Sequence, residues 1–71
     1  MRTQEGVQIG TLVRVNESYR DPYLRGRFGT VRQRYGGLSY AAFEVAFEKG
    51  QSKLFWHHEL EEAEAFYQRF G

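Results

Sequence analysis

The sequence predicts a small, mainly β domain: a partly open barrel of four to five antiparallel strands that ends in a C-terminal helix. The chain has 71 residues, a length that corresponds to one domain. Apolar and polar residues alternate in several short runs separated by glycine, proline and charged residues, which indicates short strands joined by turns. After His57 the apolar residues recur at three and four positions, which indicates a helix. Short strands with exposed edges favour partial closure into a barrel.

The elements follow one another along the chain without a linker or an internal repeat. The chain divides into an arm, a barrel and a helix at residues 1–9, 10–58 and 59–70. The four clearest strands are predicted at residues 11–16, 28–34, 39–48 and 51–56. Residues 17–27 contain the only proline and several charged residues, so they are expected to form a long loop. Gly36-Gly37 indicates a tight turn between two strands.

Alternation also predicts which side chains face the core. In the third strand Phe43, Val45 and Phe47 alternate with small or acidic residues, so these three are expected to point inward. In the second strand Val31 is expected to point inward. The opposite face of the second strand is expected to carry Thr30, Arg32 and Arg34.

The predicted helix at residues 59–70 has one apolar face. That face consists of Leu60, Ala63, Phe66, Tyr67 and Phe70. Glutamates crowd the first turn and Arg69 lies near the end, and both placements suit the helix dipole. A helix of this length is marginal in isolation. We therefore expect its apolar face to pack on the barrel or, alternatively, to form a homodimer or a partner-helix interface.

Arginine is concentrated in the first half of the chain, although the net charge is only +1. Residues 1–35 carry seven arginines against three acidic residues, whereas residues 36–71 carry three basic residues against six glutamates. The candidate partner-binding residues are Arg14, Arg20, Tyr23, Arg25, Arg27, Arg32, Arg34 and Tyr35. Arginine pairs with carboxylates and phosphates through two hydrogen bonds, and tyrosine adds contact area. The pattern predicts a surface for an acidic protein, with nucleic acid as the alternative partner.

Patterns of catalytic or metal-binding residues are missing from the sequence. There is no cysteine, and the three serines lack the context of a nucleophile elbow. His58 and Glu62 would share a helix face, but two ligands do not make a metal site. No apolar run approaches the roughly 18 residues of a membrane span. We therefore expect a cytoplasmic, non-enzymatic protein that binds no cofactor and no metal.

Short motifs across residues 10–62 resemble small SH3-like barrels. They are Gly10-Thr11-Leu12-Val13-Arg14-Val15, Gly26-x-x-Gly29-Thr30-Val31, Val45-Ala46-Phe47-Glu48 and Glu59-Leu60-Glu61. The resemblance is to the electron-transport accessory group, which includes photosystem I subunit IV, the ferredoxin-docking subunit of the photosynthetic NDH complex and the variable chain of ferredoxin–thioredoxin reductase. It implies an accessory subunit that docks an acidic partner in photosynthetic or related electron transport, in the cytoplasm or at the stromal side of a thylakoid membrane.

Two further resemblances imply other functions. Pro22-Tyr23-x-Arg25-Gly26-x-x-Gly29-x-Val31 is similar to the C-terminal barrel of the nitrile hydratase β subunit, which implies an accessory protein of that enzyme. Gly26-x-x-Gly29 also resembles the KOW element of ribosomal and transcription-factor barrels, which implies a nucleic-acid-binding module.

Overall fold

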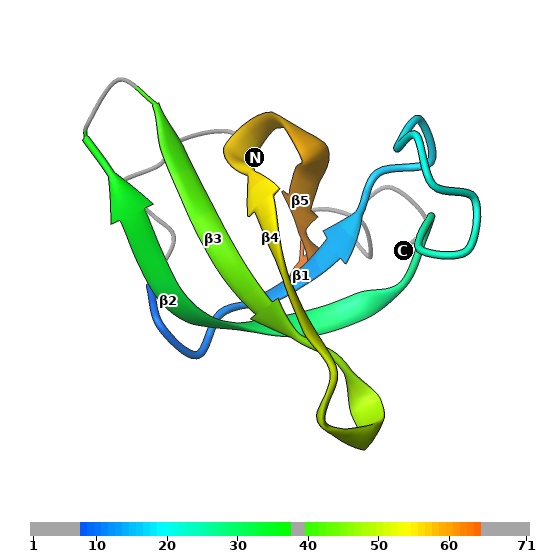
Figure 1. Cartoon of the computed structure of the whole chain (residues 1–71), viewed down its shortest axis with the longest axis horizontal. Coiled ribbons are helices and arrows are strands. Elements are labelled where there is room, and N and C mark those ends of the chain that lie inside the picture. The colour runs from blue at the N-terminus through cyan, green and yellow to red at the C-terminus, as the bar shows by residue number, and fades with distance from the viewer. Residues whose placement is uncertain (1–7, 38–39, 65–71) are drawn as a thin grey trace.

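The computed structural model describes residues 8–37 and 40–64, which form one antiparallel β-sheet (Figure 1). The strands are β1 (Leu12–Val15), β2 (Phe28–Gly36), β3 (Ala41–Ala46), β4 (Ser52–Trp56) and β5 (Leu60–Glu62). Two short 3-10 turns, η1 (Glu48–Gly50) and η2 (His57–Glu59), precede β4 and β5. The strand order is β4-β3-β2-β1-β5, so β4 and β5 are the two edges and the sheet is not closed.

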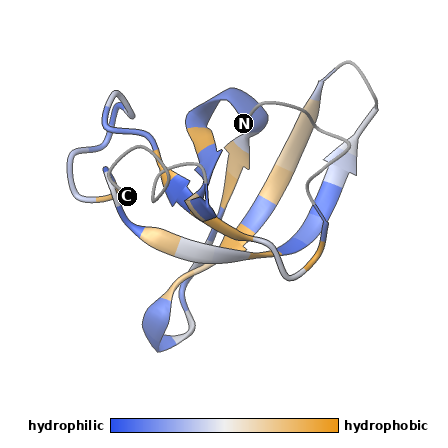
Figure 2. Ribbon diagram, turned by 180° about the vertical axis from the view of Figure 1, so that it is seen from behind, coloured by the Kyte–Doolittle hydropathy of each residue, from blue (hydrophilic) through white to orange (hydrophobic). Residues whose placement is uncertain are grey.

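The four strands predicted from alternation are confirmed. β2 is the longest, and it curves across the molecule so that its start pairs with β1 and most of its length pairs with β3 (Figure 1). A long loop connects β1 to β2, as predicted for residues 17–27. Hydrophobic residues concentrate in the strands, whereas η1 is hydrophilic (Figure 2).

The core lies on the inner face of this curved sheet. Its largest fully buried side chains are Val13, Val15, Val31, Phe43, Val45, Phe55 and Leu60. The cluster also contains Ala41, Tyr19 and Phe47, at 0%, 3% and 8% exposure. Phe43 and Val45 occupy alternate positions of β3, so the predicted inward face of that strand is confirmed. Apolar burial on this face is the main stabilising contribution to the fold.

The helix predicted from residue 59 is wrong over residues 60–62. These residues form β5, in which Leu60 lies opposite Val15 and is fully buried. Pairing with β1 satisfies the backbone and places Leu60 in the core, which outweighs the helix propensity of the glutamates. Ala63 is also buried, at 2% exposure. The remaining predicted helix-face residues, Phe66, Tyr67 and Phe70, lie outside the described residues.

A β-bulge in β2 corrects the prediction for its outward face. The register with β3 shifts between Val31 and Gln33, which inserts one extra residue into β2. Arg34 consequently lies opposite Phe43, and directly paired residues project from the same face of a sheet. Arg34 therefore does not share the outer face with Thr30, because the extra residue reverses the alternation.

Candidate binding surface

Arg14 is buried, although alternation in β1 places it on the outer face of the sheet. Its residue exposure is 8%, and Glu61 lies directly opposite it in β5. Arg14 Nη1 donates a hydrogen bond to Glu61 Oε1 at 3.1 Å, and Nη2 donates to Glu17 Oε2 on the loop. Because two carboxylates satisfy this guanidinium, we assign Arg14 to the stability of the fold and not to the binding surface.

The loop between β1 and β2 carries three exposed arginines, Arg20, Arg25 and Arg27. Arg25 Nε donates to the backbone oxygen of Tyr19, and Arg25 Nη2 donates to that of Arg20 at 3.5 Å. The guanidinium carbon of Arg20 lies 5.8 Å from the centre of the Tyr19 ring, and that of Arg27 lies 5.6 Å from the centre of the Phe47 ring. None of these three arginines forms an ion pair with a carboxylate of the described residues. Their positive charge is therefore open to a partner.

Two tyrosines of this loop have opposite environments. Tyr19 packs on Phe55 with 5.1 Å between ring centroids. Burial raises the pKa of Tyr19 above its usual value, the negative charge of Glu59 adds to this effect, and Arg20 opposes it. Tyr23 is 86% exposed. Tyr23 is thus free to contact a partner, whereas Tyr19 belongs to the core.

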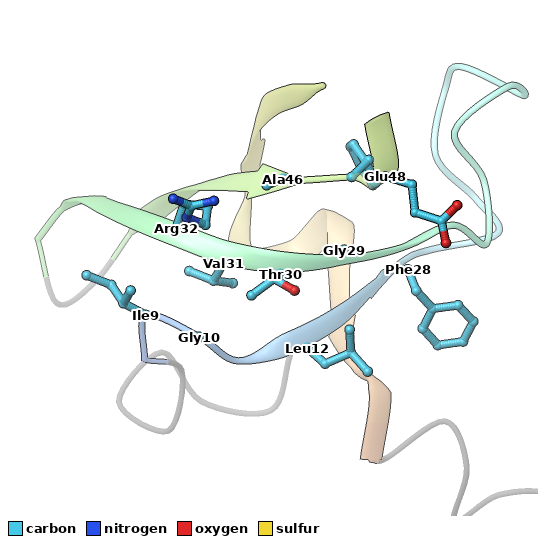
Figure 3. Close-up of a pocket in the computed structure, with 11 residues that line it drawn as sticks. Ile9, Gly10, Leu12, Phe28, Gly29, Thr30, Val31, Arg32, Ala46 and Glu48 are labelled. Carbon is cyan, nitrogen blue, oxygen red and sulfur yellow. The ribbon is translucent and has the colours of Figure 1, made fainter. Parts of the chain in front are cut away.

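An open groove of about 610 Å³ crosses the outer face of β1, β2 and the end of β3 (Figure 3). The side chains that shape it include Ile9, Leu12, Phe28, Thr30, Arg32 and Glu48. Ile9 and Leu12 are 64% and 46% exposed, so the groove has apolar walls in contact with solvent. Arg32 lies at one end, and Phe28 and Glu48 lie at the other (Figure 3).

A second hollow of about 410 Å³ adjoins the groove. Arg32, Ala46 and Phe47 border both depressions, so Arg32 stands between them. Glu44 lines the second hollow, and its Oε2 accepts a hydrogen bond from Ser52 Oγ at 3.2 Å. The outer face therefore places one exposed guanidinium between depressions that each contain a carboxylate.

Arg34 and Tyr35 lie farther along β2. Nε and Nη2 of Arg34 are buried and have no hydrogen-bond partner among the described residues. Tyr35 is 49% exposed and lies opposite Ala42 in β3. The loop between β1 and β2 and the end of β2 lie on opposite sides of the molecule (Figure 1). The residues predicted to form one surface are therefore distributed over the loop, the groove and the end of β2.

An exposed aromatic cluster at the end of β4 was not predicted from the sequence. Tyr40 stacks on Trp56 with 4.6 Å between ring centroids, and each residue is 46% exposed. The Tyr40 hydroxyl and His58 Nε2 share a hydrogen bond of 3.1 Å, and the His57 and Tyr40 rings pack in a T-shaped arrangement with 5.1 Å between their centroids. Burial lowers the pKa of His57, and the neighbouring His58 lowers it further. Only the register of β3 with β4 brings these residues together, so the alternation within one strand could not reveal the cluster.

The described part of the chain contains no group of three or more histidine or carboxylate side chains placed to hold a metal ion. Within residues 8–37 and 40–64, no helix has the length and apolar character needed to cross a membrane. No protein-family profile, no characterised protein sequence and no solved structure matches the chain, so the geometry of these residues carries the functional assignment.

Proposed function

We propose that this protein is a non-enzymatic accessory domain that docks an acidic partner protein through its exposed arginines. The observation that carries the proposal is the contrast among the arginines. Arg14 holds two carboxylates, whereas Arg20, Arg25, Arg27 and Arg32 are exposed and form no ion pair within the described residues. Unpaired guanidinium groups on a surface attract carboxylates and speed association with an acidic protein.

The order of elements supports an SH3-like barrel as the scaffold. A long loop follows the first strand, a 3-10 turn precedes the last, and the last strand pairs with the first. In this interpretation the loop between β1 and β2 is a binding loop on a rigid sheet, where binding residues commonly occur. The resemblance to the electron-transport accessory group makes an acidic redox protein, such as a ferredoxin, the partner we propose.

The distribution of charge favours a protein over nucleic acid. Nucleic-acid-binding domains often have a pI above about 9, whereas this sequence has a pI of about 8.1. Glu44 lines the hollow beside Arg32 and Glu48 lies at the other end of the groove (Figure 3), and both would repel a phosphate backbone on the outer face. An acidic protein offers discrete carboxylates, which can avoid these glutamates.

Titration calorimetry with a plant-type [2Fe–2S] ferredoxin as the acidic probe tests the proposal. The variant pairs Arg20→Gln with Arg27→Gln, which removes two loop charges and leaves the Arg25 hydrogen bonds in place. At about 20 mM salt we expect affinity to fall about tenfold, and at about 300 mM salt the difference should nearly vanish because surface charges are screened.

The matched control pairs Lys49→Gln with Lys53→Gln, an equal loss of charge at exposed residues outside the loop. An equal loss of affinity in this control, or affinity that does not change with salt, would contradict docking through the arginines. A single-stranded RNA oligonucleotide is titrated in parallel. Tighter binding of the RNA than of the ferredoxin would replace the proposal with a nucleic-acid-binding function.

A further inference from the structure

We propose that Arg32 and the groove beside it bind an extended peptide segment, with one carboxylate on Arg32 and one apolar side chain against Leu12. The inference rests on the proposed docking function, because it specifies the segment of the acidic partner that is recognised. It adds a second kind of contact. The arginines of the loop attract any negatively charged surface, whereas the groove selects a segment that has both a carboxylate and an apolar side chain that fits.

The β-bulge is the first reason to place the carboxylate on Arg32. The register shift between Val31 and Gln33 leaves Arg32 without a residue opposite it in β3. A bulge disrupts the pairing of a strand, and bulges often direct a side chain toward a site. Arg32 is exposed and forms no hydrogen bond or ion pair within the described residues. Its fork of donors is therefore open to a carboxylate, which it can bind with two hydrogen bonds.

The apolar walls of the groove are the second reason. Leu12 is 46% exposed and Ile9 is 64% exposed, so neither is needed to complete the core. Leu12 lies opposite Thr30, and Phe28 precedes Thr30 by two positions on the same face of β2. Leu12 and Phe28 lie toward the end of the groove away from Arg32 (Figure 3). An apolar side chain placed against Leu12 would remove this exposed wall from water, which is the main source of affinity in such contacts.

The length of the groove fits an extended chain. Arg32 and Phe28 are four positions apart on β2, a separation of about 13 Å at the usual rise of a strand. An extended peptide beside β2 therefore places its acidic and apolar residues roughly two to four positions apart. The groove is open and not enclosed, which suits a peptide more than a small molecule buried on all sides.

The neighbouring carboxylates decide between a peptide and nucleic acid at this site. Glu48 lies at the far end of the groove, and Glu44 lines the adjoining hollow. A nucleic acid would bring phosphates at regular intervals toward both glutamates. A peptide with one carboxylate and neutral or basic neighbours is complementary to a single guanidinium with a glutamate on either side.

The test is selection from a phage-displayed library of random peptides about eight residues long, which extend to about 26 Å. We expect the selected peptides to share one Asp or Glu roughly two to four positions from a large apolar residue. The strongest peptide is then synthesised and titrated into the full chain. Arg32→Gln should weaken it about tenfold, and Arg32→Lys should weaken it less because the charge remains.

Leu12→Ser tests the apolar wall, and Leu54→Ser is its matched control, because Leu54 is 57% exposed on β4 and does not line the groove. We expect Leu12→Ser to weaken the peptide about fivefold to tenfold and Leu54→Ser to leave it unchanged. Two-dimensional amide spectra of each variant verify the fold. In the original chain, the peptide should shift the amide signals of Thr30 and Ala46.

The inference is overturned if no peptide is enriched, or if the Arg32→Gln and Leu12→Ser variants bind the peptide as tightly as the original chain. It is also overturned if these two residues affect the binding of an RNA oligonucleotide but not the binding of the peptide. Its failure is distinguishable from failure of the docking function. Loss of ferredoxin binding in the Arg20 and Arg27 variant, with no effect of Arg32→Gln, would retain docking through the loop and reject the groove.

Discussion

Arg14 and Arg32 lie on the outer face of adjacent strands, yet their surroundings are opposite. Arg14 has Glu61 directly across from it in β5 and Glu17 above it on the loop. Arg32 sits on the bulge of β2, where the register with β3 is interrupted. Strand register therefore decides which arginine stabilises the fold and which one is left for a partner.

The largest expected effect tests the Arg14 side of this comparison. Arg14→Leu removes one charged partner of Glu61, whose side chain is only 19% exposed, so a poorly hydrated carboxylate loses this ion pair. We expect the free energy of unfolding to fall by about 2–3 kcal/mol, measured by urea denaturation. Glu17 is 69% exposed and regains water, so it adds little to this loss.

Arg32→Gln is the matched comparison for stability. An exposed residue without an internal partner should change the free energy of unfolding by less than about 0.5 kcal/mol. A loss as large as that of Arg14→Leu would show that Arg32 is tied into the fold, and the contrast between the two arginines would fail.

A smaller effect on the free energy of unfolding is expected at Gly26, where the loop between β1 and β2 contacts Arg14. Gly26 has φ +75°, and a Cβ there would lie 2.9 Å from Glu17 Oε2 and 3.0 Å from Arg14 Nη2. Gly10 has φ +97°, and a Cβ added there would have no heavy atom within 4 Å. Alanine at either position strains the backbone by about 1 kcal/mol, and at Gly26 it also displaces the ion pair.

We therefore expect Gly26→Ala to destabilise the protein by about 2 kcal/mol and Gly10→Ala by about 1 kcal/mol in thermal or urea unfolding. In the Arg14→Leu background the two alanine variants should converge, because the ion pair is already absent. If Gly26→Ala still lowers the free energy of unfolding more than Gly10→Ala does in that background, the effect of Gly26 is independent of Arg14.

The parts of the structure that the sequence predicts are those that depend on local alternation, and the parts that it does not predict depend on strand register. Alternation within one strand identifies β1 to β4 and the inward direction of Phe43, Val45 and Val31, because burial on one face is a local pattern. The bulge at Arg32 depends on how β2 meets β3, so a uniform alternation places Arg34 on the wrong face. The local pattern carries no information about register.

Pairing between distant segments explains the other differences. Glu61 lies 47 positions from Arg14 in the chain, and only the pairing of β5 with β1 makes them partners. The same pairing makes Leu60 a strand residue, although its glutamate-rich surroundings indicate a helix. The abundance of arginine was visible in the sequence, but the division into structural and exposed arginines required the sheet.

His57 provides the smallest and last test, because it is a basic side chain that is partly buried without a carboxylate hydrogen bond among the described residues. Burial lowers its pKa in the folded state, and His58 lowers it further. As pH falls below about 6.5, His57 in the unfolded chain therefore takes up a proton before His57 in the folded chain does. The free energy of unfolding is unaffected by this group above that pH, and it decreases as the pH falls from about 6.5 to the folded-state pKa. Urea unfolding at about pH 7.5 and pH 5 should show a smaller loss of stability in His57→Gln than in the original chain. If both proteins lose the same free energy of unfolding between these pH values, protonated His57 costs the fold nothing. His57 would then resemble the exposed arginines, whose charge is not buried.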